Sequence, residues 1–140
     1  MTPDKVALVQ TSFQKVAPIA DTAADLFYGR LFEIAPQVRP MFPDDMSEQK
    51  TKLMKMLATA VTHLHEVEKI VPAVQHLGRT HAGYGVTDDQ YDVVAEALIW
   101  TLGKGLGDDF TDEVQGAWVE AYTLLATVMK QAAAEVSAPA

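Results

Sequence analysis

The spacing of apolar residues along the chain indicates helices almost everywhere. In the first segment Val6, Val9, Phe13 and Val16 mark one helical face, and later segments repeat the same three-or-four-residue spacing. No segment shows a sustained alternation of apolar and polar residues with β-branched enrichment, which would indicate a strand. We therefore predict an all-α fold.

Capping residues, prolines and glycines set the expected bounds of these helices. Six long helices are expected at about residues 3–18, 21–34, 47–64, 71–82, 87–103 and 111–129. A short helical piece lies between Pro36 and Pro40, and a corner follows at residues 42–45. Thr87 and Gln90 fit a capping box at the start of the fifth helix.

The ends of the later helices are predicted from loop signals. A loop is expected at residues 65–69, and the tail from about residue 135 is expected to fray. Two groups of glycines are expected to end the fourth and fifth helices, namely Gly83 and Gly85, and Gly103, Gly105 and Gly107.

Length and charge narrow the class of protein. The 140 residues suit one domain spanning residues 1–140, with enough chain to bury a core. Eleven basic and nineteen acidic residues give a formal charge of −8, and the basic residues are scattered, which argues against nucleic acid or anionic membranes as partners. No stretch approaches the roughly 20 apolar residues of a membrane span, and the N-terminus lacks a secretory pattern, so a cytoplasmic location is expected. Without cysteine, thiolate metal sites and disulfides are excluded.

The four histidines are the candidate metal ligands. His63 and His65 are two residues apart and His76 and His81 five apart, so neither pair has the spacing of a helical chelate. We expect His63, His65 and His76 to be ordinary surface or partly buried residues. His81 shares an apolar helix face, and by itself this placement fits either a core residue or a ligand.

Several separated segments, in order along the chain, resemble the globin family. The segment Leu77–Val86 is similar to the globin helix that carries the haem ligand, and residues 90–98 and 117–122 are similar to the next two helices. Residues 26–32 and 36–42 resemble the second helix and corner of bacterial single-domain haemoglobins and of the globin part of flavohaemoglobins. The resemblance extends from about Val6 to Met129 and implies a globin fold around a haem pocket.

The resemblance implies haem b as cofactor and His81 as the proximal iron ligand. It places Phe42 against the haem plane and the polar pair Tyr28 and Gln49 on the distal side. Leu53, four residues after Gln49, is expected to face the same way. The residues implied to bind the cofactor are His81, Phe42, Tyr28, Gln49, Leu53, Arg79 and Tyr91.

Three of these roles have a structural alternative. Gln49 could be a solvated surface residue, Tyr28 a core tyrosine bonded to backbone, and Phe42 a corner-filling aromatic. Since glutamine does not readily ligate iron, the resemblance implies a five-coordinate ferrous iron when no gas is bound.

The proximal side departs from flavohaemoglobins at one position. Those proteins combine a tyrosine, matched here by Tyr91, with a glutamate from the last helix, but the aligned residue here is Ala133. Glu135 lies two residues later and on a different face. The departure weakens the case for peroxidase-like chemistry, because no carboxylate is matched to the imidazole N–H. The sequence also lacks the glycine-rich phosphate loop of flavin and nicotinamide domains.

Four functional hypotheses follow. The first is a haem protein that reversibly binds dioxygen, carbon monoxide or nitric oxide for storage, delivery or sensing. The second is a nitric oxide dioxygenase that takes electrons from a separate reductase. The third is a haemless globin fold acting as a regulatory module, and the fourth, a signalling bundle with His81 as phosphoacceptor, conflicts with the apolar surroundings of this histidine.

Overall fold

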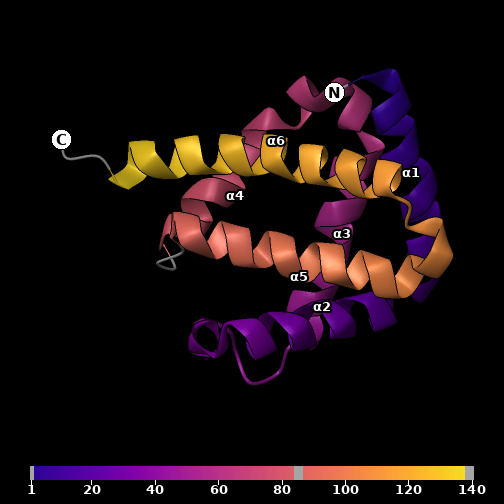
Figure 1. Cartoon of the computed structure of the whole chain (residues 1–140). Coiled ribbons are helices and arrows are strands. Elements are labelled where there is room, and N and C mark those ends of the chain that lie inside the picture. Colours follow the sequence, from indigo (N-terminus) through magenta and orange to yellow (C-terminus); the bar gives the residue numbers. More distant parts are fainter. Residues whose placement is uncertain (1, 84–86, 138–140) are drawn as a thin grey trace.

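The computed structural model describes residues 2–83 and 87–137, and these residues form helices without any strand (Figure 1). The all-α prediction is confirmed. The α-helices are α1 (Pro3–Val16), α2 (Ala20–Ile34), α3 (Ser47–Thr62), α4 (Val71–Gly83), α5 (Asp88–Leu106) and α6 (Asp112–Ser137). Short 3₁₀ helices connect them, namely η1 (Ala17–Ile19), η2 (Pro36–Met41), η3 (Leu64–Lys69) and η4 (Gly107–Asp109).

The helices pack in crossing pairs. The α4 helix packs mainly on α6, α2 on α5, and α1 on α6. In Figure 1, α5 and α6 run in opposite directions, α2 lies on the other side of α5 from α6, and α3 crosses behind α5. None of the helices in the described part of the chain is long and apolar enough to cross a membrane.

The local sequence explains where several helices begin. The Thr2 hydroxyl accepts a hydrogen bond from the backbone N–H of Lys5 (3.3 Å), and Pro3 occupies the first turn of α1. At the start of α5 the Gln90 side chain accepts from the backbone N–H of Thr87 (3.1 Å), as the capping-box pattern predicts.

The predicted end of α5 is wrong by several residues. Gly103 and Gly105 lie inside the helix, and only Gly107 ends it, with a positive φ of 57° that favours glycine. A glycine inside a helix costs up to about 1 kcal/mol, which the burial of Leu102 and Leu106 outweighs.

Two other expected boundaries also differ. The expected loop at residues 65–69 is the 3₁₀ helix η3, whose backbone is interrupted at Glu66. The last helix, expected to about residue 129, continues to Ser137, and the fraying of the tail from about residue 135 stays a prediction. Gly85 and residues 138–140, for which the sequence predicts a helix stop and a frayed end, lie outside the described residues.

One close helix crossing places α4 against α6. A Cβ built on Gly78 would lie 2.7 Å from the Cα and 2.9 Å from the carbonyl carbon of Met129. No side chain fits between two backbones at that separation. Gly78 therefore sets the approach of α4, the helix that carries His81, to α6.

Candidate functional site

Tyr28 and Gln49 form a hydrogen-bonded pair between two helices. Tyr28 lies on α2 with only 4% of its surface exposed, and Gln49 lies in the first turn of α3. The Gln49 side-chain amide donates to the Tyr28 hydroxyl oxygen at 3.1 Å. The phenolic hydrogen is therefore left to donate to a third group.

The protonation of Tyr28 follows from its surroundings. Burial raises the pKa of Tyr28 above its ordinary value, and the hydrogen bond from Gln49 lowers it by a smaller amount. The hydroxyl is thus a proton-bearing donor at neutral pH.

Three other aromatic rings pack around the ring of Tyr28. The Tyr28 ring lies edge-on to Phe27 (5.0 Å between centroids) and Phe42 (5.6 Å), and it stacks with Phe32 (6.0 Å). Phe32 and Phe42 also meet edge-on at 5.4 Å. Phe42, the residue after η2, is thereby fixed between the end of α2 and the corner that leads to α3.

His81 lies in the last turn of α4 and is half-buried. Its Nδ1 is 2.7 Å from the backbone carbonyl oxygen of Leu77 one turn earlier. Since a carbonyl only accepts, Nδ1 carries the hydrogen and donates, which leaves the lone pair on Nε2. A neutral imidazole oriented in this way is a typical metal ligand.

Tyr91 of α5 lies next to His81, with 6.4 Å between ring centroids and 34° between ring planes. The Tyr122 hydroxyl donates to the backbone carbonyl of Tyr91 at 2.6 Å, and the Lys130 ammonium lies 5.5 Å from the Tyr91 ring centroid. Burial, reinforced by Tyr91 and Asp92 nearby, raises the pKa of Tyr122 above its ordinary value. The α6 helix thus contacts Tyr91 at two points, its backbone carbonyl and its ring.

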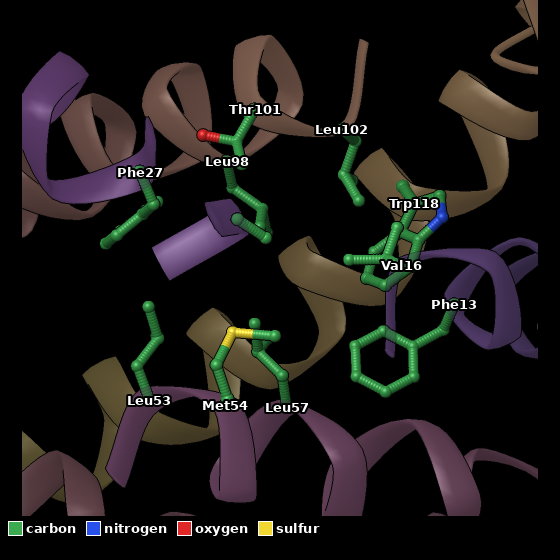
Figure 2. Close-up of a pocket in the computed structure, with 11 residues that line it drawn as sticks. Phe13, Val16, Phe27, Leu53, Met54, Leu57, Leu98, Thr101, Leu102 and Trp118 are labelled. Carbon is green, nitrogen blue, oxygen red and sulfur yellow. The ribbon is translucent and has the colours of Figure 1, made fainter. Parts of the chain in front are cut away.

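Leu53 lines an apolar cavity in the middle of the molecule (Figure 2). On one side of this cavity lie Leu53, Met54 and Leu57 of α3, and Phe27 of α2 lies across from Leu53. Because Phe27 also contacts Tyr28, the cavity adjoins the aromatic cluster described above.

The structure therefore brings the predicted site residues together in two groups. One group joins Tyr28, Gln49 and Phe42, with Leu53 nearby, and the other joins His81 and Tyr91. In Figure 1 the end of α4, which carries His81, and the η2 turn, which precedes Phe42, lie at the same end of the molecule. Arg79 is exposed on α4 and joins neither group through any contact found in the described chain.

The remaining histidines lie outside both groups. His76 is exposed, His65 is exposed with Nε2 3.5 Å from a Glu66 carboxylate oxygen, and His63 is half-buried. Within residues 2–83 and 87–137 no three histidine or carboxylate side chains gather into a metal site. One histidine is sufficient as the protein ligand where a prosthetic group supplies the other donors.

Sequence reasoning missed two charged residues that contact the predicted site residues. Arg39 donates hydrogen bonds to the backbone around Phe42, and Lys130 lies over Tyr91. Neither residue has a local sequence signal. Arg39 binds the backbone of an irregular segment, and Lys130 of α6 contacts a residue of another helix. Ala133, the matched position of the flavohaemoglobin glutamate, is half-buried, and the Glu135 side chain lies outside the described residues.

Comparison with known proteins identifies the family. Residues 25–129 of this chain match the model of the protein family described as "Globin". The chain belongs to the globin family. Globins are haem proteins, and the imidazole of His81, whose Nδ1 donates to a backbone carbonyl so that the Nε2 of the neutral ring keeps its lone pair, fits a haem iron.

The relatives of this globin carry several different names. An anaerobic nitrite reductase of Brassica napus is 34% identical, and the alignment covers 92% of this chain and 89% of that protein. A leghemoglobin of Psophocarpus tetragonolobus is 33% identical, with 94% and 97% covered. A flavohemoprotein of Xylella fastidiosa is 27% identical over 92% of this chain but only 33% of its own length.

A solved structure supports the same fold. An engineered carbene transferase, made from a candidate nitric oxide dioxygenase of Rhodothermus marinus, superposes with a TM-score of 0.89 at 26% identity. The match covers 98% of this chain and 96% of that one. The predicted globin fold is confirmed.

Proposed function

We propose that this globin binds haem b through His81 and reversibly binds dioxygen, carbon monoxide and nitric oxide at a ferrous iron. The observation that carries the proposal is the 2.7 Å hydrogen bond from His81 Nδ1 to the Leu77 carbonyl. This bond favours the tautomer with the hydrogen on Nδ1, in which the Nε2 lone pair would bind the iron. Phe42 and Leu53 would supply apolar contact to the porphyrin, Tyr91 would support the proximal ring, and Arg79 would lie near the edge of the haem.

The distal side would be made by Tyr28 with Gln49. A haem supplies, when bound, a ferrous iron at which dioxygen becomes a partly negative acceptor while carbon monoxide stays nearly neutral. The Tyr28 hydroxyl, which accepts from Gln49, has its hydrogen available for such an acceptor. Neither side chain is a good ligand for ferrous iron, so the proposal includes a five-coordinate iron in the absence of gas.

The test is the pair of gas dissociation rates in the variant Tyr28→Phe. A hydrogen bond to a partly charged acceptor contributes roughly 1.5–3 kcal/mol. Since each 1.4 kcal/mol is about tenfold, dioxygen should dissociate about ten- to a hundredfold faster from Tyr28→Phe. Carbon monoxide dissociation should change far less. Stopped-flow displacement and flash photolysis measure the two rates.

The variant Gln49→Leu separates the two members of the pair. It removes the bond that orients the phenol but keeps the donor, so dioxygen dissociation should rise by less than in Tyr28→Phe. Equal small effects on both gases in both variants would show that Tyr28 is a packing residue and would refute the polar distal site.

Nitric oxide dioxygenation is a second candidate, favoured by the matches to flavohemoproteins and to the Rhodothermus protein. This reaction joins nitric oxide and dioxygen into nitrate and needs an electron from outside the globin. The test is nitrate formation from nitric oxide and dioxygen with NADH and an added flavin reductase as electron source, with Tyr28→Phe as comparison. Absence of reductase-dependent nitrate would restrict the proposal to reversible gas binding.

A further inference from the structure

Arg39 spans the corner between η2 and α3 with its guanidinium group. Its Nη1 donates to the backbone carbonyls of Phe42 (3.3 Å) and Pro43 (3.0 Å), and its Nη2 donates to that of Asp44 (3.3 Å). Three successive carbonyls of an irregular segment are thus bound by one side chain. The planar fork of arginine can do this because its donors have fixed relative directions.

The corner lies outside the regular helices, so helical hydrogen bonds do not fix its backbone. Helix η2 ends at Met41 and α3 begins at Ser47, so the carbonyls of residues 42–44 lie between regular elements. Pro43 and Asp44 are exposed, so the effect of Arg39 is to order the segment rather than to pair buried carbonyls: hydrogen bonds from one charged donor to three successive residues restrict their backbone.

The same guanidinium also contacts the aromatic cluster. The Arg39 Cζ lies 5.1 Å from the Phe32 ring centroid, and Phe32 contacts both Tyr28 and Phe42. Arg39 therefore links the backbone that carries Phe42 to the rings that enclose the Tyr28 phenol. Beyond the corner, the first turn of α3 carries Gln49, the partner of Tyr28.

We propose that Arg39 is a positioning residue that fixes this corner and thereby orients the Tyr28–Gln49 donor pair. It acts through the Phe42 backbone and the Phe32 ring. The inference rests on the proposed function, in which Tyr28 discriminates between dioxygen and carbon monoxide. Removing the Arg39 guanidinium should therefore shift the position of the Tyr28 hydroxyl. The hydroxyl itself stays present and protonated.

Arg30 provides a matched control. It is also an arginine stacked on an aromatic ring, with Cζ 5.3 Å from the Trp100 ring centroid, but its other contact is a 3.5 Å ion pair with the exposed Glu33. It binds no corner carbonyl within the described chain. Arg30→Met therefore removes a comparable charge and stack without touching the corner.

The experiment compares Arg39→Met, Arg39→Lys and Arg30→Met, each alone and combined with Tyr28→Phe. The interaction energy between residues in contact commonly corresponds to about a three- to tenfold change in a rate or equilibrium constant. Arg39→Met should therefore speed dioxygen dissociation about three- to tenfold, with little change in carbon monoxide dissociation. In the Tyr28→Phe background the effect should disappear. Arg39→Lys should resemble Arg39→Met, because an ammonium cannot span three carbonyls, and Arg30→Met should resemble the parent protein.

Hydrogen–deuterium exchange of the same proteins gives a readout that does not depend on gas binding. Arg39→Met should speed exchange in the peptide covering residues 42–49 and leave α5 and α6 unchanged. Unchanged exchange there, an equal effect on both gases, an effect that persists with Phe at position 28, or full retention by Arg39→Lys would overturn the inference. If Tyr28→Phe alone has no effect, the proposed function fails, while the exchange data still decide whether Arg39 holds the corner.

Discussion

At the residue scale, the structure places two of the predicted site residues, Tyr28 and Gln49, in direct contact, and it shows further contacts that the sequence did not predict. Tyr28 and Gln49 were predicted as a pair, and the structure joins them by a hydrogen bond; their role toward a haem gas stays a prediction. Arg39 was not predicted, because a guanidinium binding three carbonyls of an irregular corner leaves no periodicity in the sequence. The hydrogen bond from Tyr122 to the Tyr91 carbonyl was missed for a related reason, since it depends on how two helices cross.

Tyr122 gives a prediction about stability and pH. Its pKa is raised in the folded protein, so below the ordinary value of about 10 both states are protonated and its hydroxyl bond is fully present. As the pH rises above about 10, the unfolded chain loses this proton before the folded protein does, and the free energy of unfolding falls. Tyr28 contributes in the same direction.

Tyr122→Phe should therefore change the free energy of unfolding at neutral pH and its dependence on pH above about 10. At pH 7 it removes a hydrogen bond and should lower the free energy of unfolding by about 1 kcal/mol. Above pH 10 it should make that free energy fall less steeply than in the parent protein. Urea unfolding at pH 7, 9.5 and 10.5 measures both effects, and identical slopes in the two proteins would contradict the buried, raised-pKa phenol.

At the element scale, the helical pattern predicted all six long helices, because each has an apolar face that the core needs. The bounds were least accurate where glycine was taken as a stop signal. Gly103 and Gly105 stay helical because neighbouring leucines are buried, and only Gly107 adopts a positive φ. The role of Gly78 could not be predicted, since no sequence feature says that α4 crosses α6 at this residue.

Two glycine substitutions test the helix crossing. Gly78→Ala places a Cβ against the backbone of Met129, which cannot rotate away, so it should lower the free energy of unfolding by about 1–3 kcal/mol. Gly116→Ala, on the exposed side of α6 with nothing within 4 Å, should raise it by about 0.5–1 kcal/mol. Urea denaturation measures both, and a neutral Gly78→Ala would mean that the two helices do not approach as closely as described.

At the scale of the whole molecule, fold class and family followed from the sequence, and both are confirmed by the helical architecture and the globin match. The assignment of residues 1–140 to a single domain stays a prediction. The apolar cavity beside Leu53 was not foreseen, because its walls come from helices far apart in the sequence.

The central claim is that His81 holds a haem iron whose opposite side is free for gas. The most direct measurement is the optical spectrum of the purified protein and of His81→Ala in ferric, ferrous and carbon monoxide-bound forms, with His76→Ala as the control on the same helix. The parent protein and His76→Ala should give a five-coordinate ferrous spectrum, whereas His81→Ala should lose haem or that spectrum, because its only protein ligand is gone. Undiminished haem binding with an unchanged spectrum in His81→Ala, or a bis-histidine ferrous iron in the parent protein, would contradict the claim.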